Sequence, residues 1–241
     1  MHKRIRLNAA ALAGLLIILF FLIIAVFAPV IAPYDPKEMI ASYLPPSREH
    51  LLGTNDVGQD IFSEMVYGTR VSLYIGIFAA FIVTGVGTVL ALVSGYFGGV
   101  TDKIITAITN IAMAVPSLPL TVLLVAYLNP GKWSLIIAIS VTAWTGTARI
   151  LRSRVMQLKE LPFIKIEKTM GVHPVVILFK HILPNIKDII LTRGAMAISG
   201  AMMTEAGLSF LGLGEFGEKS WGSVLHYAFF RNSIMKKQYW W

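Results

Sequence analysis

The segment Ala148–Lys187 reads ARILRSRVMQLKELPFIKIEKTMGVHPVVILFKHILPNIK. It is too polar to cross a bilayer and too long to be a simple turn. Residues 149–187 hold eight lysines and arginines against two glutamates, so the segment is strongly cationic. A segment of this charge between two apolar stretches predicts ordered structure below a membrane, where it can dock a partner.

Prolines and a glycine divide the second half of this segment into two helix patterns. Pro162 occupies the favoured first position of a short helix that runs to Met170. Gly171 is placed as a left-handed stop. A second helix, Val175–Leu183, is expected to end at Pro184 and the asparagine after it. Residues 149–161 are expected to extend the preceding span out of the membrane.

The rest of the chain has the composition of a membrane protein. It has 241 residues, of which 56% are hydrophobic and 14% are charged, and its mean hydropathy is +0.69. A spanning helix needs about 20 largely apolar residues. The sequence therefore predicts an all-α, polytopic membrane helical bundle with five spans. The expected spans are Leu7–Val30, Val71–Phe97, Ile104–Leu128, Trp133–Ile150 and Ile189–Leu211.

The first apolar segment admits a second interpretation as a signal peptide, because His2, Lys3 and Arg4 precede it. Its apolar run is longer than the roughly 7–15 residues of a signal sequence, which favours a retained span. The sequence contains no cysteine, which excludes disulfides and thiol catalysis.

The distribution of charge predicts the orientation. Residues 34–70 hold three lysines and arginines against six acids, the reverse of the 149–187 segment. Because positive loops stay inside, the N-terminus and residues 149–187 are expected in the cytoplasm and residues 34–70 outside. The net charge of +8 is thus explained by topology rather than by nucleic acid.

Three parts follow from this topology: residues 1–33, with the N-terminus and first span; the external loop 34–70; and a core transmembrane domain, 71–241. Within the loop, apolar positions 61, 62, 65 and 66 share one helical face. This pattern favours a helix at the outer interface over a plain connector.

Residues inside the spans indicate a packed bundle with moving parts. The small residues of Gly194–Ala201 let helices approach closely, and Pro116 and Pro119 are expected to kink the third span. Glu205 is an ionisable group within a span, which makes it a candidate pathway or gate residue. The alternative is that Glu205 only caps or pairs with a neighbour near the interface.

Other sequence patterns give less information about function. Residues 212–217 match G-x-G-x-x-G, but they follow a span instead of a strand, so the glycines are expected to end a helix and form a turn. The histidines are scattered and lack a tight carboxylate set, so no metal site is predicted. No set of catalytic residues stands out either.

Several motifs resemble one family. Gly171 followed by HILPN at 181–185 resembles the cytoplasmic loop of binding-protein-dependent ABC importer permeases. LGTNDVGQDIFS at 52–63 looks like the external signature of the dipeptide, oligopeptide and nickel permease group. ALVSGYFGG at 91–99 and EAGLSFLGLG at 205–214 fit the same group. The arrangement resembles the C-type partner of the two permease subunits.

The resemblance implies uptake of di- or oligopeptides that an extracytoplasmic solute-binding protein delivers, in the plasma (inner) membrane of a prokaryote. Nickel or oligosaccharides are alternative cargoes. The implied partners are a B-type permease, two cytoplasmic ABC ATPases that bind ATP and Mg, and membrane lipid, with no nucleic acid. The chain itself is expected to bind no cofactor and to catalyse no reaction.

In the family, a short helix of the cytoplasmic loop sits in a groove on the ATPase, and this implies a docking set here. Its expected members are Lys165, Glu167, Lys168, Thr169, Met170, Gly171, His181 and Pro184.

The chain departs from the family pattern in two places. Aligned on Gly171, the family's Glu-Ala-Ala positions are Lys165, Ile166 and Glu167, so a base stands where the first acid is expected. The family normally has a sixth span after the last external loop. This sequence stops at the aromatic residues 239–241, which resemble an interface belt just before a span. Either the sequence is truncated there, or the usual sixth span is missing.

Two other classes of protein remain as alternatives. An ion-coupled secondary transporter would show related halves, and residues 1–120 and 121–241 show no repeat. A lipid-binding scaffold would explain the lysines of the 149–187 segment as an anionic-lipid patch. It would not explain the proline and glycine punctuation.

Overall fold

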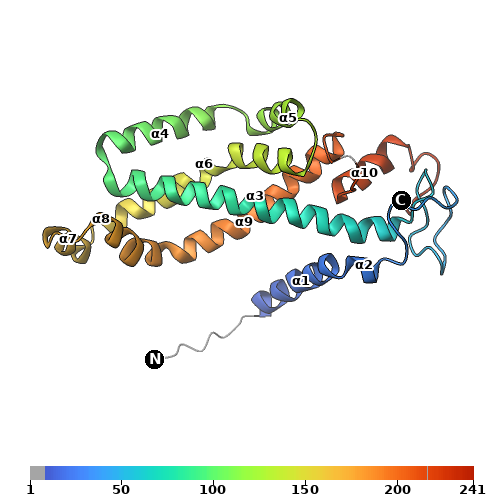
Figure 1. The fold of residues 1–241 in the computed structure, drawn as a ribbon, viewed down its shortest axis with the longest axis horizontal. Helices are drawn as coiled ribbons and strands as arrows, with labels where there is room; N and C mark the ends of the chain where they lie inside the picture. The colour runs from blue at the N-terminus through green and yellow to red at the C-terminus, as the bar shows by residue number, and fades with distance from the viewer. Residues whose placement is uncertain (1–8, 216) are drawn as a thin grey trace. The chain divides into compact units, whose positions relative to one another are not determined.

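The computed structural model describes residues 9–215 and 217–241, and their regular structure is helical (Figure 1). Within these residues, extended pairing is confined to an isolated bridge between Thr54 and Asp60. The all-α prediction is confirmed. The elements are α1 (Ala9–Val26), α2 (Ala28–Ile31), α3 (Ile61–Phe97), α4 (Gly99–Ala114), α5 (Ser117–Leu128), α6 (Lys132–Lys159), α7 (Pro162–Thr169), α8 (Pro174–Val176), the π-helix η1 (Ile177–Ile182), α9 (Leu183–Phe210) and α10 (Trp221–Phe230).

The chain forms two compact units, and two helices pass from one unit into the other. The first unit comprises the residues up to Tyr74 together with Ser209–Trp241, and the second comprises Ile75–Leu208. The first holds α1, α2, the loop that follows them and α10. The second holds the helices from the later part of α3 to most of α9, including the whole 149–187 segment.

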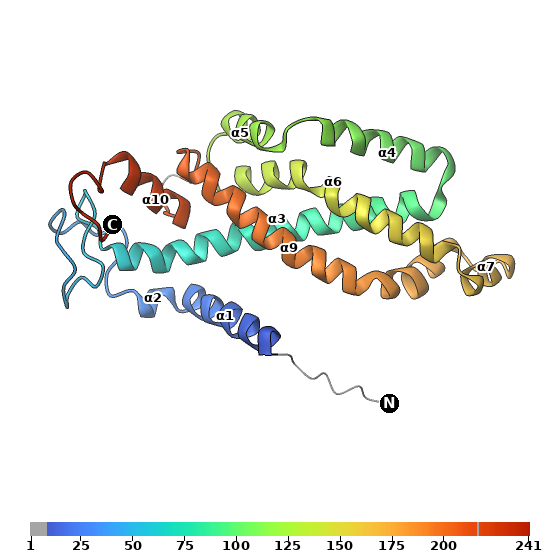
Figure 2. The ribbon, with the colours of Figure 1, turned by 180° about the vertical axis from the view of Figure 1, so that it is seen from behind.

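Helix α6 is the centre of the second unit, where it packs against α4, α5, α7 and η1. Figures 1 and 2 show α3 and α6 running between α4 and α9, with α7 beyond the ends of α6 and α9. Small residues bring α3 close to α6. An added Cβ at Gly87 would lie 2.9 Å from Thr147, and one at Gly95 would lie 2.8 Å from Val155.

Three of the helices are long and apolar enough to cross a membrane: α1, α3 and α6. A fourth crossing requires α4 and α5 to be counted as one bent span. The five predicted spans are therefore only partly recovered. The predicted fifth, α9, is long enough, but its glycines, threonines and charged residues such as Arg193 and Glu205 lower its mean hydropathy.

The predicted third span is broken rather than kinked. The axes of α4 and α5 differ by 87° at the break between them. Pro116 has no N–H to continue the helix, and Val115 before it is extended, with φ −84° and ψ 128°. The predicted bend is therefore found at Pro116, but it is sharper than a kink, because residues 104–128 form parts of two separate helices.

The expected interfacial helix is the beginning of α3, because the helix runs without a break from Ile61 to Phe97. Asp60 caps its start, since its carboxylate accepts hydrogen bonds from the Ser63 N–H at 2.8 Å and the Ser63 hydroxyl at 2.7 Å. Gly68 alone does not interrupt the helix. The prediction of an amphipathic start is consistent with this, but it missed the continuity.

The boundaries near the cytoplasmic segment are partly as predicted. Helix α6 continues to Lys159, which confirms that the fourth span extends beyond residue 149. Helix α7 covers Pro162–Thr169, which confirms the short helix predicted to start at Pro162. Pro184, however, does not end a helix but lies at the second position of α9. The π-helical turn η1 stands directly before it, and the Leu183 N–H bonds to Leu178 O, five residues back. The wider turn accommodates a proline that cannot donate a hydrogen bond.

Helix α9 ends at Phe210, and a turn at Gly212 follows it. Gly212 has φ +83°, and its N–H bonds to Ser209 O at 3.0 Å. The helix end and turn predicted for the first glycine of residues 212–217 are confirmed. Residue 216 of that motif lies outside the described residues.

Candidate functional site

The 149–187 segment is anchored by one hydrophobic cluster at the shared end of several helices. It joins the last turns of α3 and α6 to α7, η1 and the start of α9. Because Ile164 of α7 is 2% exposed and sits in this cluster, α7 is fixed to the bundle and is not a free loop. The buried members are Ala91, Leu92, Tyr96, Leu151, Val155, Leu158, Ile164, Ile177, Leu178, Ile182 and Ile186.

Local backbone chemistry sets both ends of α7. Pro162 stands at the first helical position, as the sequence predicts. At the other end, Gly171 has φ +77°, its N–H bonds to Lys168 O at 3.2 Å, and the Val172 N–H bonds to Glu167 O at 3.1 Å. These two bonds form a Schellman motif, which places a left-handed residue after the helix. The predicted role of Gly171 as a stop is confirmed.

Helix α7 has two unlike faces. Phe163, Ile166 and Met170 are exposed by 42, 58 and 75%, and they lie on one side of the helix at about 100° per residue. The opposite side carries buried Ile164 with Lys165 and Lys168, and these three residues line one shallow pocket. The Phe163 ring lies edge-on to His181, whereas Ile166 and Met170 are mostly exposed. The apolar outer face is therefore the surface that a partner protein can contact.

Two ion pairs flank α7, and they differ in burial. Glu167 contacts His181 Nε2 at 2.8 Å, and both side chains are about three-quarters buried. Lys165 contacts Glu160 at 2.9 Å, and both of these side chains are more than half exposed. The hydrogen bond from Lys165 lowers the pKa of the Glu160 carboxyl. Only the Glu167–His181 pair joins α7 to η1. We therefore expect this pair, rather than Lys165–Glu160, to hold α7 in place.

The two pairs allow a matched test of what holds α7. We expect Glu167→Ala to raise hydrogen exchange in α7 about fivefold, since the loss of a largely buried hydrogen bond costs roughly 1 kcal/mol. Glu160→Ala should change exchange by less than about twofold, because its pair is exposed. Exchange of the peptide covering 162–171, followed by mass spectrometry, measures both. Equal effects of the two variants would contradict the assignment.

Polar contacts between α6 and α4 hold the start of the 149–187 segment. Arg152 on α6 donates two hydrogen bonds, both 2.6 Å, to the Asp102 carboxylate on α4. Arg149 donates to the Asn110 side chain at 3.1 Å, also from α6 to α4. Two of the cationic residues at the start of the segment are thus used within the bundle. They are not available to a partner, which charge counting alone did not indicate.

The predicted site residues do not all come together. Lys165, Glu167 and His181 take part in the ion pairs, and the Thr169 hydroxyl bonds back to Lys165 O at 3.0 Å. Pro184 belongs to α9 and supports the turn before it. Glu205 lies much farther along α9 with its side chain fully buried, so it is not part of this group. Its role in a pathway or gate stays a prediction.

Sequence reasoning missed a buried polar network in the first unit. The Lys219 ammonium binds the Glu64 carboxylate, and it also donates to the Gln59 side chain at 2.7 Å. The Asn55 side chain donates to Glu64 at 2.8 Å. Beside it, His50 Nδ1 lies 3.0 Å from Asp60. Glu64 and Lys219 are 155 residues apart, so no local pattern linked them.

Neither unit offers a metal site among the described residues, where no group of three or more His, Cys, Asp or Glu side chains could hold an ion. The arrangement of α7 is suited to transmitting a movement rather than to chemistry. A short helix with a mostly exposed apolar face is fixed to the ends of two helices that can span a membrane.

Comparison with known proteins identifies the family. The family described as "Binding-protein-dependent transport system inner membrane component" matches residues 87–232, which include the whole 149–187 segment. The chain belongs to this family. A second match, "N-terminal TM domain of oligopeptide transport permease C", covers residues 1–46. The chain is therefore a membrane-embedded, multi-pass permease subunit.

Curated relatives agree with this assignment. The permease is 39% identical to the oligopeptide transport system permease protein OppC of Bacillus subtilis, over 92% of this chain and 73% of that protein. It is 38% identical to the dipeptide transport system permease protein DppC of Haemophilus influenzae, over 86% of this chain and 73% of that one. Subunits of this kind are not themselves enzymes.

The fold has a solved counterpart in an inward-facing structure of the MetNI methionine ABC transporter. The TM-score is 0.56 at 19% identity, and the match covers 73% of this permease and 90% of that chain. At this identity the likeness concerns the fold alone. It is the fold of an ABC importer transmembrane subunit.

Proposed function

We propose that the chain is the C-type permease subunit of an ATP-driven importer for dipeptides or oligopeptides. Its cargo arrives on an extracytoplasmic solute-binding protein. Two cytoplasmic ATPase subunits, with ATP and Mg bound to them, drive transport, and a B-type permease completes the pathway. The single observation that carries this proposal is the combination of the family match with α7, a fixed helix whose apolar face is mostly exposed.

The names of the relatives support the choice of cargo. Those quoted above are oligopeptide and dipeptide permeases, and both align over most of this chain. The proposed orientation rests on charge, because the cationic 149–187 segment and the N-terminus belong on the cytoplasmic side by the positive-inside rule. This orientation, in the inner membrane of a prokaryote, presents α7 to the compartment that contains ATP.

The docking surface proposed for the ATPase is the outer face of α7, formed by Phe163, Ile166 and Met170. Gly171 sets the direction of the chain after it, and the Glu167–His181 pair holds the helix against η1. Lys165 and Lys168 belong to the opposite side of α7, so they are secondary members of the docking set. Closure of the ATPases on ATP would push this helix and bias the bundle between two arrangements.

A substitution at Gly171 tests the proposal. Nothing lies within 4 Å of an added Cβ there, so the only obstacle is φ +77°, which costs an L-residue roughly 1–2 kcal/mol. We expect Gly171→Val to displace the end of α7 and to abolish most ATP-driven peptide uptake in proteoliposomes. Gly171→Asn should retain uptake, because asparagine tolerates the left-handed conformation.

Co-purification distinguishes the possible outcomes. An ATPase subunit should accompany the wild-type chain and the asparagine variant, and it should be depleted from the valine variant. Uptake that follows an ion gradient and ignores ATP would contradict the importer proposal. Uptake and co-purification that are unchanged in Gly171→Val would show that α7 has no coupling role.

A further inference from the structure

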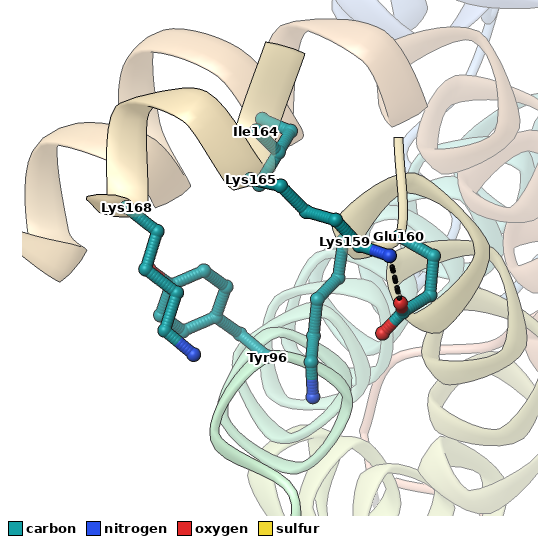
Figure 3. Close-up of a pocket in the computed structure, with 6 residues that line it drawn as sticks. All are labelled: Tyr96, Lys159, Glu160, Ile164, Lys165 and Lys168. Atoms are coloured by element: carbon teal, nitrogen blue, oxygen red, sulfur yellow. Dashed lines mark ion pairs between the residues drawn. The ribbon is translucent and has the colours of Figure 1, made fainter. Parts of the chain in front are cut away.

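A basic pocket lies on the side of α7 that faces the bundle. It is lined by the ends of α3 and α6 and by the inner side of α7 (Figure 3). The lining residues are Tyr96, Lys159, Glu160, Ile164, Lys165 and Lys168. Tyr96 and Ile164 are its buried apolar members, with 8% and 2% of their surfaces exposed. The pocket therefore combines an apolar floor with a cationic rim.

The charges of the pocket do not cancel. Glu160 is the acid of the rim, and its carboxylate is bound by Lys165 at 2.9 Å. Figure 3 shows Lys159 and Lys168 extending in the same direction, away from that ion pair. The other nearby acid, Asp102, is held by Arg152. The ammonium groups of Lys159 and Lys168 therefore give the pocket lining a net positive charge.

The position of the pocket indicates which anion reaches it. Tyr96 is the last residue but one of α3, and Lys159 is the last residue of α6. Helix α3 is long and apolar enough to cross a membrane, and its predicted span ends at Phe97, one residue beyond Tyr96, so the pocket lies at the level of that end. Lipid phosphates lie at this level. Aromatic side chains are enriched there, and basic pockets between spanning helices bind anionic headgroups.

The lysines of the pocket lie away from the apolar outer face that is the main docking surface. Lys168 follows Ile164 by one helical turn, whereas Ile166 and Met170 point to the other side. A partner seated on the outer face of α7 would leave the pocket open. We infer that the pocket binds a phosphate group, supplied by the headgroup of an anionic phospholipid such as phosphatidylglycerol, and that Lys159 and Lys168 are its main ligands.

The inference is tested by lipid binding to the full-length chain, with any subunits that accompany it, purified in detergent. Native mass spectrometry follows titration with dioctanoyl phosphatidylglycerol, and dioctanoyl phosphatidylcholine is the neutral control. We expect the Lys159→Gln/Lys168→Gln variant to bind phosphatidylglycerol roughly 25-fold more weakly, about fivefold for each lysine. Phosphatidylcholine binding should not change in that variant.

The matched control is Lys180→Gln/Lys187→Gln, which removes the same charge from exposed positions of the same segment. It should leave phosphatidylglycerol affinity within about twofold. Equal losses in the two double variants would overturn the inference, because diffuse charge would then explain binding. No loss in Lys159→Gln/Lys168→Gln would overturn it as well.

Inorganic phosphate distinguishes the source of the ligand. If millimolar phosphate leaves phosphatidylglycerol bound, the lipid assignment stands. If phosphate displaces the lipid and itself binds in a Lys168-dependent way, the phosphate site stands with a soluble ligand, and the lipid assignment is overturned. Neither measurement needs ATP or peptide. Failure here is therefore distinguishable from failure of the proposed importer function.

Discussion

Lys219→Met should lower the free energy of unfolding by about 3–5 kcal/mol at alkaline pH, because it leaves a buried carboxylate without its counter-charge. Near neutral pH the carboxyl can take up a proton, and the loss is smaller. The Glu64 side chain is 1% exposed, and it accepts hydrogen bonds from Lys219 and Asn55. The remaining amide of Asn55 cannot neutralise the charge. Denaturation of the purified protein in detergent, followed by tryptophan fluorescence, measures the loss.

Two further variants make this prediction specific. Lys236→Met removes a lysine that donates to the Tyr43 hydroxyl at 3.0 Å on the surface, and it should cost less than about 1 kcal/mol. Glu64→Gln combined with Lys219→Met removes both charges, and it should recover much of the loss. A Lys219 variant no less stable than the Lys236 variant would refute a stabilising role for the buried pair.

The cytoplasmic segment shows what local sequence can predict. Proline at the start of α7 and glycine after it act through φ angles and missing donors, which are properties of single residues. For this reason the bounds of α7 and the stop at Gly171 were predictable. The resemblance to permeases then pointed to the same segment before any contact was known.

Tertiary context decided the features that local patterns got wrong. Pro184 has the chemistry of a helix stop, yet the π turn η1 before it absorbs the missing hydrogen bond and α9 continues. Pro116, by contrast, breaks its span by 87°. Both residues carry the same local signal. What surrounds each proline, and not its identity, determines whether the helix bends, widens or stops.

The resemblance to permeases had a similar limit for the proposed docking set. The family resemblance grouped Lys165 and Lys168 with Met170, because all three belong to the short helix of the cytoplasmic loop and its end. Their positions around α7 separate them into an inner basic side and an outer apolar face. The inner side faces the ends of two spans. Proximity along a helix therefore did not indicate a shared partner, and the two sides receive different proposals above.

Gly95→Leu should be among the most damaging single changes in the second unit. An added Cβ would lie 2.8 Å from two Val155 side-chain atoms and 3.1 Å from the Arg152 carbonyl oxygen. Helix α6 would have to move, and Val155 belongs to the cluster that anchors α7. Overpacking of this kind costs roughly 1–3 kcal/mol. We expect a lower thermal midpoint in detergent together with faster hydrogen exchange in α7.

Gly85→Leu is the matched control, because nothing lies within 4 Å of its added Cβ on the same helix. It should leave both the midpoint and the exchange of α7 unchanged, since leucine favours helices and apolar surroundings. Gly87, two turns before Gly95 with Ala91 between them, should behave like Gly95, because its Cβ would meet Thr147 at 2.9 Å. All three glycines lie in α3 and carry the same local signal. If Gly85→Leu proved as damaging as Gly95→Leu, the α3–α6 contact would not run through the Gly87, Ala91 and Gly95 face, and α7 would have to be anchored in another way.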